Sequence, residues 1–258
     1  MHDSARIAEQ DMDKENKVTV MDAATVVVAR DCADGIEVLM LKKNSKIFFG
    51  GMWVFPGGRV DAEDAHPEDT DDITRFKRAA VREADEEAGI QIDAANIVHF
   101  SHWMPPPVRP KRFSTHFFLA HASNQLMDVE VDGGEITEHM WTTPRQALAR
   151  RHAGEIEVVT PTFVTLDWLR RYARVADVIA DINGPVKFHT HITAVEDGNI
   201  AFYHGDVAYN SLDPSAPGPR RRANMLKSGW WWEEHDGNGN GPWTQPVDFE
   251  LPNESSDK

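Results

Sequence analysis

The alternation of apolar and polar positions predicts that the folded part of the chain opens with strands. Residues 24–30 (ATVVVAR) and 36–42 (IEVLMLK) are short runs rich in β-branched and aliphatic side chains, a composition typical of strands. The sequence DCADG separates them and places Asp34-Gly35 at the connection, which is a common hairpin turn. The two runs therefore predict a β-hairpin.

Helical spacing of apolar positions replaces this alternation further along the chain. It predicts a helix from about Ile73 to Ala88, and Gly89 supplies a C-terminal stop. The other elements expected in this region are strands at 96–103 and 113–121, a short helix after Pro144, and a longer helix from about Pro161 to Asp181. Helices mixed among hairpin-linked strands indicate an α+β fold, an α/β/α sandwich with a mixed sheet between helices.

The C-terminal part of the chain differs in amino-acid composition. The segments KFHTHITAV and IAFYHGDVAY predict a second β-hairpin, and the chain beyond Asp213 is rich in Pro, Gly, Asn and Trp. Residues 236–258 are expected to form a loop or strap. We expect Trp230, Trp231 and Trp232 to pack this strap onto the domain, since tryptophan buries a large area. The expected organisation is a flexible arm (1–19), a main domain (20–182) and a C-terminal extension packed on it (183–258).

Composition narrows the class of protein. The 258 residues are 41% apolar and carry a net charge of −15, which fits a globular protein and argues against non-specific binding to nucleic acid or membrane surfaces. The single cysteine, Cys32, excludes an intramolecular disulfide. No run of 18 apolar residues occurs, and the N-terminus lacks the apolar core of a signal peptide. We expect a cytoplasmic protein.

The predicted helix ends in an unusual concentration of acids. Residues 82–90 read READEEAGI, and like charges at helical spacing cost about 0.2–0.5 kcal/mol per pair. At about 100° per residue, Glu83, Glu86 and Glu87 share one face, whereas Asp85 points away. This face is either solvated or a cation site. The preceding FPGGRVD, whose glycines allow a sharp turn and close backbone approach, favours the cation site.

Together these positions resemble the Nudix box, G-x5-E-x7-R-E-U-x-E-E-x-G-U, in which U is a bulky apolar residue. The matching residues are Gly58, Asp64, Arg82, Glu83, Glu86, Glu87, Gly89 and Ile90. Asp64 stands where the family has glutamate, and Ala84 replaces a bulky apolar residue. About ten additional residues lie between Asp64 and Arg82. The resemblance covers residues 20–182 and implies the Nudix fold.

The interrupted box is similar to the coenzyme A diphosphatase branch of the Nudix hydrolases. The supporting segments are Phe55–Ala62, Trp103–Pro105, Arg112–Phe118 and Trp141–Pro144. This resemblance implies a hydrolase that cleaves a diphosphate bond in a nucleoside diphosphate linked to another moiety, such as coenzyme A or acyl-coenzyme A. It also implies Mg²⁺ or Mn²⁺ as cofactor, which agrees with the preference of these hard cations for carboxylate oxygen.

The resemblance assigns expected roles to residues of the box. Glu86 and Glu87 are expected metal ligands, and Glu83 is expected to be a ligand or the general base that orients water. Arg82 is expected to hold the glutamates in place. The backbone of Gly58 is expected to reach the metal shell.

Candidates outside the helix have two interpretations each. In other Nudix hydrolases an additional base or ligand often comes from a later loop, and Glu135 and Glu138 are the candidates here, although either fits a solvated loop acid equally well. Arg112 and Arg109 are candidates for binding substrate phosphate, and so is Arg59; the alternative for the first two is an ordinary exposed basic loop.

Three other functions remain as alternatives. A ligand-binding or regulatory module with a Nudix fold and no turnover is disfavoured by the presence of all three glutamates. An isopentenyl-diphosphate isomerase is disfavoured because no catalytic cysteine is evident, and a structural protein would use its Trp-rich tail as the main surface. The expected partners are a small nucleotide-type diphosphate and, as an open alternative, a second copy of the chain in a homodimer.

Overall fold

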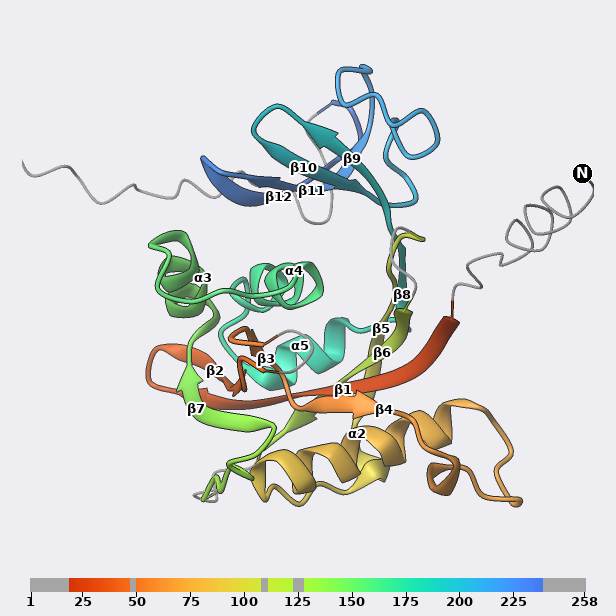
Figure 1. The fold of residues 1–258 in the computed structure, drawn as a ribbon, viewed down its shortest axis with the longest axis vertical. Coiled ribbons are helices and arrows are strands. Elements are labelled where there is room, and N and C mark those ends of the chain that lie inside the picture. Colours follow the sequence, from red (N-terminus) through yellow and green to blue (C-terminus); the bar gives the residue numbers. More distant parts are fainter. Residues whose placement is uncertain (1–18, 47–49, 108–110, 123–127, 239–258) are drawn as a thin grey trace, which may run out of the picture. The chain divides into compact units, whose positions relative to one another are not determined.

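The computed structural model describes residues 19–46, 50–107, 111–122 and 128–238 (Figure 1). All but the last residue of the expected flexible arm, 1–19, lies outside these ranges, as does most of the expected strap, 236–258. The chain divides into two compact units, Met1–Thr190 and His191–Lys258.

The first unit is built on a mixed sheet. Within the described ranges its strand order is β3-β2-β1-β6-β5-β8, with β4 paired to β1 and β7 paired to β2. The strands are β1 (Thr19–Cys32), β2 (Gly35–Lys43), β3 (Trp53–Val54), β4 (Gly57–Arg59), β5 (Val98–Met104), β6 (Lys111–His121), β7 (Ile136–Thr142) and β8 (Val186–His189). The predicted first hairpin is confirmed, since β1 and β2 pair antiparallel up to Cys32 and Gly35.

Helices lie on both faces of this sheet. They are α2 (Ile73–Ala88), α3 (Pro144–His152), α4 (Thr160–Leu169) and α5 (Val175–Asp181), and two short 3₁₀ turns are η1 (Ala62–Asp64) and η2 (Ala94–Asn96). Figure 1 shows α2 against one face, and α3, α4 and α5 on the other. The expected sandwich of a mixed sheet between helices is confirmed.

Strand β1 lies in the middle of the large sheet, and both of its faces are covered, so its side chains are apolar on both faces. It pairs in parallel with β6 over eleven residue pairs and antiparallel with β2 and β4. Ala24, Val26 and Val28 belong to the core cluster that α2 also enters, and Val27 is fully buried as well. A continuous run of β-branched residues is what a strand covered on both sides requires.

Helix α2 approaches the sheet closely because its buried face is made of small residues. Ala79, Ala80, Ala84 and Ala88 are all fully buried, and Ala84 therefore occupies a position where a larger side chain would press against the core. Gly89 follows in the left-handed conformation, with φ of 66°, and its N–H bonds to the Asp85 carbonyl at 2.8 Å. The predicted helix and its glycine stop are confirmed.

The single helix expected from about Pro161 to Asp181 is wrong; two helices, α4 and α5, replace it. Asp167 in the last turn of α4 accepts hydrogen bonds from Arg170 and Arg171. Helix α5 then begins at Val175, whose N–H donates to Asp31 Oδ1 at 2.7 Å. The Asp31 carboxylate thus satisfies a backbone N–H that a continuous helix would have bonded internally.

The second expected hairpin is confirmed between β9 (His191–Val195) and β10 (Gly198–Phe202), which pair antiparallel, but the residues expected to open its first strand belong to another sheet. Residues Val186–His189 form β8 and pair in parallel with β5 of the large sheet, and the N–H of Thr190 donates to the Met104 carbonyl. The division between the units therefore falls after Thr190, a few residues later than the expected boundary at 183. Residues from His191 onward belong to the second unit.

The second unit contains a four-stranded antiparallel sheet in the order β12-β11-β10-β9. Its strands are β9 (His191–Val195), β10 (Gly198–Phe202), β11 (Arg220–Leu226) and β12 (Gly229–His235). Arg222 and Asp206 form a buried ion pair, with bonds of 2.8 and 2.7 Å from Nε and Nη2. Since both side chains are desolvated, removing either partner alone would leave a buried charge unpaired.

A group of histidines lies on the face of the large sheet that carries α2. His116 Nδ1 and His99 Nε2 are 3.0 Å apart, and His116 stacks on His102 and lies 4.0 Å, between ring centroids, from Phe76 of α2. Burial lowers the pKa of His116 to about 3 and the pKa of His99 to about 4. Both imidazoles are therefore neutral wherever the protein is folded near neutral pH.

These histidines predict a loss of stability in mild acid. Above pH 6.5 they are neutral in both states, but between about pH 6.5 and 4 they take up protons in the unfolded chain only, so stability falls as the pH falls. Urea unfolding of the metal-free protein at several pH values measures this slope. His116→Phe should flatten the slope, whereas the same change at the exposed His121, on the same strand, should leave it as in the wild type; equal slopes for all three proteins would contradict the expectation.

Candidate active site

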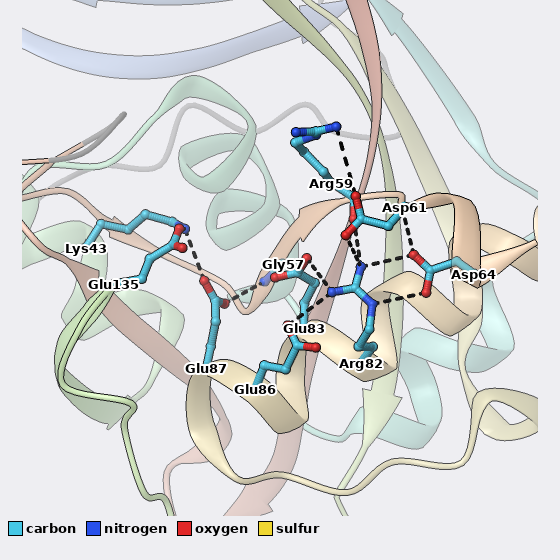
Figure 2. A network of polar contacts seen from close by, with 10 residues as sticks. All are labelled: Lys43, Gly57, Arg59, Asp61, Asp64, Arg82, Glu83, Glu86, Glu87 and Glu135. Carbon is cyan, nitrogen blue, oxygen red and sulfur yellow. Dashed lines mark hydrogen bonds and ion pairs between the residues drawn. The ribbon is translucent and has the colours of Figure 1, made fainter.

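The three glutamates of α2 lie beside β4 (Figure 2). The Glu83 carboxylate lies so close to Gly58 that a Cβ atom on Gly58 would overlap it. Neighbouring Gly57, with φ of 159°, pairs with Thr25 of β1. The two glycines of FPGGRVD thus allow the backbone of β4 to pass close to the carboxylates of Glu83 and Glu87. The expected approach of Gly58 to a metal stays a prediction.

Glu87 is the most buried of the three glutamates, with 4% of its surface exposed. Its Oε2 accepts a hydrogen bond from the Gly57 N–H at 2.9 Å, and its Oε1 accepts one from Lys43 Nζ at 3.0 Å. Burial raises the pKa of Glu87 to about 7, although Lys43 and the Gly57 N–H act in the opposite direction. The site therefore holds this carboxylate at a desolvation cost that one lysine does not cancel.

Glu83 and Glu86 share one cationic partner. Arg82 Nη1 donates to Glu83 Oε1 at 3.0 Å and to Glu86 Oε2 at 3.1 Å. Glu83 is largely covered and Glu86 is exposed. Burial raises the pKa of Glu83, and the charge of Arg82 opposes that shift. A single guanidinium nitrogen thus lies between two carboxylates that the resemblance assigns to a metal.

Arg82 also ties the box helix to the segment before the insertion. Its Nε and Nη2 donate to the two oxygens of buried Asp64 at 3.1 and 3.0 Å, and Nη2 donates to the Arg59 carbonyl at 2.9 Å. Asp64 therefore makes the bidentate contact that a guanidinium fork favours, despite the additional residues before α2. The hydrogen bond to Asp64, the largest contribution, raises the pKa of Arg82 against the effect of burial.

The inserted segment has its own anchor on α2. Arg78, one turn before Arg82, binds the carboxylate of Asp69 through both terminal nitrogens and also the carbonyl of Asp64. Asp69 thus fixes the middle of the insertion to the same helix. Consequently Asp64 stays beside Arg82 although the chain between them is longer than in the family pattern.

The structure separates the two acids proposed outside the helix. Glu135, in the loop before β7, binds Lys43 Nζ, the same nitrogen that binds Glu87. Glu138, three residues later on β7, binds Lys42 Nζ at 2.7 Å, and both of those side chains are substantially exposed. Of these two acids, Glu135 is therefore the one that shares a lysine with a glutamate of α2.

The three arginines proposed for substrate binding differ in position. Arg59 follows Gly58 on β4, is 63% exposed and has Asp61 as an ion-pair partner only at 4.0 Å. Arg112 Nη1 donates to the Pro105 carbonyl at 3.0 Å, and its buried Nε has no hydrogen-bond partner among the described residues. Arg109 lies outside those residues. Of the three, Arg59 is the one that extends from the glycine segment beside the glutamates (Figure 2).

Lys43 is the functional candidate that sequence reasoning missed. It is the last residue of β2, its ammonium joins Glu87 to Glu135, and the two carboxylates raise its pKa although burial alone would lower it. A polar residue at the end of the apolar run IEVLMLK was the available signal. That signal did not distinguish Lys43 from Lys42 beside it.

The donor set suits a hard divalent cation by its chemistry. Among the labelled residues of Figure 2 there are six carboxylates but only three cationic side chains, which leaves a formal excess of negative charge. The part of the chain that the structure describes contains no group of three or more His, Cys, Asp or Glu side chains with the geometry of a metal site. Arg82 and Lys43 engage the carboxylates instead, so these glutamates would have to exchange partners to bind a metal.

Comparison with known proteins agrees with this geometry. The model of the NUDIX domain matches residues 20–163, which is more than half of the chain. The protein therefore belongs to the Nudix family. The crystal structure of a NUDIX hydrolase from Alicyclobacillus acidocaldarius superposes with a TM-score of 0.56 at 25% identity, covering 64% of this chain and 97% of that one.

Two curated relatives are matched over only part of their own length. "Putative nudix hydrolase 7" of Caenorhabditis elegans is 26% identical over 175 residues, which cover 54% of this chain and 57% of the relative. Acyl-coenzyme A diphosphatase NUDT19 of Xenopus laevis is 28% identical over 131 residues, covering 47% of this chain and 34% of the relative. The match thus spans about half or less of these relatives.

No helix within the described ranges is both long and apolar enough to cross a membrane.

Replacing Asp64 tests its link to Arg82. Asp64→Asn removes the buried charge that receives two guanidinium hydrogen bonds, and we expect it to lower the free energy of unfolding by about 2–3 kcal/mol. Asp61→Asn is the matched control: Asp61 is half exposed and lies 3.7 Å from Arg82, so a loss below about 0.5 kcal/mol is expected. Urea denaturation measures both, and similar losses would show that Asp64 has no special role.

Gly58→Ala tests the close approach of β4 to α2. The added methyl group must displace the Glu83 carboxylate, and overpacking of this kind costs about 1–3 kcal/mol. Gly134→Ala is a suitable comparison, because a Cβ there would meet only the Asp132 side chain, at 3.2 Å. Thermal and urea unfolding should show the larger loss for Gly58→Ala; the reverse order would mean that Glu83 adjusts freely.

Proposed function

We propose that this protein is a Mg²⁺- or Mn²⁺-dependent diphosphatase. Its substrate would be a nucleoside diphosphate linked to another moiety, with coenzyme A or acyl-coenzyme A as the first candidates. The observation that carries the proposal is the packing of Glu83 and Glu87 against the Gly57-Gly58 backbone, with Glu86 joined to Glu83 through Arg82. Carboxylates concentrated at a close approach of backbone are suited to hold a cation next to a phosphate chain.

The glutamates of α2 would hold the cation, with Glu86 and Glu87 as principal ligands and the backbone of Gly58 beside them. When bound, a divalent cation neutralises the charge of the diphosphate and makes its phosphorus accessible to water. Glu135 is the candidate for an additional carboxylate, since Lys43 joins it to Glu87. Glu138, paired with Lys42, is not proposed for this role.

Glu83 is proposed as the general base. Burial raises the pKa of its carboxylate, which makes it a better proton acceptor near neutral pH. The oxygen of a water molecule would form a new bond to phosphorus while the bridging P–O bond breaks, and the proton of that water would pass to Glu83. Arg82 would keep Glu83 and Glu86 in position, as its contacts to both and to Asp64 suggest.

Basic side chains near the glutamates are proposed to bind the substrate. Arg59 has an exposed guanidinium next to Gly58, where it could meet a phosphate through charge-assisted hydrogen bonds. Arg112, the second residue of β6, and Arg109, which precedes that strand in the sequence, are proposed for the same purpose. The choice of coenzyme A derivatives rests on the segments that resemble the coenzyme A diphosphatase branch and on the 28% identity to the Xenopus laevis acyl-coenzyme A diphosphatase.

Activity measurements on purified protein test this function. We expect hydrolysis of at least one of coenzyme A, acyl-coenzyme A, ADP-ribose, NADH or a dinucleoside polyphosphate with Mg²⁺ or Mn²⁺, and loss of activity on chelation. Glu86→Gln should lower kcat at least about 100-fold because a carboxylate ligand is lost. Mass spectrometry of the products identifies the cleaved bond.

Glu138→Gln is the matched control, since it removes the same charge from an acid that pairs with Lys42, and it should retain activity. Turnover that survives Glu86→Gln would contradict the proposed metal site. Binding of a nucleotide without turnover of any substrate in the panel would instead indicate a ligand-binding module with the Nudix fold.

A further inference from the structure

Lys43 is a buried cation placed between two acids from different elements. Its Nζ bonds to Glu87 of α2 and to Glu135 of the loop before β7. The Lys43 side chain is 11% exposed and that of Glu87 is 5% exposed. Buried charges of this kind persist only when they are paired, so the ammonium compensates Glu87 as long as no other cation does so.

The two partners of Glu87 differ in their freedom to move. The Gly57 N–H on Oε2 belongs to the backbone of β4, which is fixed in the sheet by its pairing with β1. The Lys43 ammonium on Oε1 is carried by four methylene groups, and such a stem reorients readily. A divalent cation approaching Glu87 would repel the ammonium and leave the N–H in place. Lys43 is therefore the partner that can withdraw.

We propose that Lys43 is a built-in counter-cation of the metal site, which holds Glu87 and Glu135 together in the metal-free protein and is displaced when the divalent cation binds. This inference rests on the proposed function, because it assumes that Glu87 takes part in binding the metal. Lys43 is thus a positioning residue that opposes metal binding and preserves the arrangement of the acids until the metal arrives.

The chain offers a matched control at the adjacent residue. Lys42 carries the same charge and also pairs with one acid, Glu138, at 2.7 Å. The Lys42–Glu138 pair is more exposed than the Lys43–Glu87 pair. Among the described residues, neither Lys42 nor Glu138 forms an ion pair with a glutamate of α2. Removing Lys42 therefore alters the net charge by the same amount without touching the proposed ligands.

The test compares Mn²⁺ affinity, measured by isothermal titration calorimetry, in the wild type and in Lys43→Met and Lys42→Met. Because Lys43→Met removes the competing charge within contact distance of Glu87, we expect its Kd for Mn²⁺ to be at least about tenfold lower than that of the wild type. Lys42→Met should stay within about twofold of the wild type, since an exposed charge is screened. Equal or weaker Mn²⁺ binding in Lys43→Met would overturn the proposal.

A second measurement on the wild type does not depend on the folding of Lys43→Met. Acetylation of lysines, followed by mass spectrometry, reports how free each ammonium group is. We expect saturating Mg²⁺ to speed modification of Lys43 at least about threefold, since the ammonium leaves its two acids, and to leave Lys42 unchanged. No change at Lys43 would overturn the inference.

The two proposals fail in distinguishable ways. If the wild type binds Mn²⁺ and hydrolyses a diphosphate while both Lys43 measurements show no change, only the role of Lys43 is overturned. If the wild type binds no Mn²⁺ and Glu86→Gln has no effect on any activity, the metal-dependent function fails, and the role of Lys43 fails with it.

Discussion

The guanidinium of Arg82 is the contact on which the site depends. It joins three pieces of chain through four partners: Asp64 of η1, the Arg59 carbonyl of β4, and Glu83 and Glu86 of its own helix. Like-charged glutamates one turn apart destabilise a helix, and the Arg82 guanidinium, which binds both Glu83 and Glu86, offsets that repulsion. Arg82 also fixes how far β4 lies from α2. The glycine at position 58 is then a consequence, since Glu83 fills the space that a side chain would need.

The second cation, Lys43, acts at the other end of the same row of acids. Arg82 and Lys43 engage the carboxylates from opposite sides, and each links α2 to a segment distant in sequence (Figure 2). The difference is that Arg82 is anchored by Asp64, a buried partner that has no proposed role in metal binding, whereas the side-chain partners of Lys43 among the described residues are the acids Glu87 and Glu135. One cation is therefore structural and the other is exchangeable. This asymmetry suits a site that must be stable when empty and still accept a divalent ion.

Local sequence signals predicted the parts of this structure that depend on neighbouring residues. The first hairpin, α2 and its stop at Gly89 follow from spacing and turn chemistry alone, and the family pattern selected the three glutamates. The separate start of α5 was missed because the first N–H of that helix, on Val175, donates to Asp31, a residue of β1 far away in sequence. The partnership of Lys43 with Glu87 spans 44 residues, and nothing local distinguishes Glu135 from Glu138 before the phase of β7 is known.

The alternation of Lys42 and Lys43 at the end of β2 makes the site sensitive to alignment. The pairing of β2 with β7 is irregular between these two lysines, so the local register decides which ammonium reaches Glu87 and which reaches Glu138. A shift of one residue in a strand exchanges its faces. Insertion or deletion of one uncharged residue within β2 would thus exchange a buried cation for an exposed one without altering the net charge, and an alignment of sequences in this family would still show a lysine at that position.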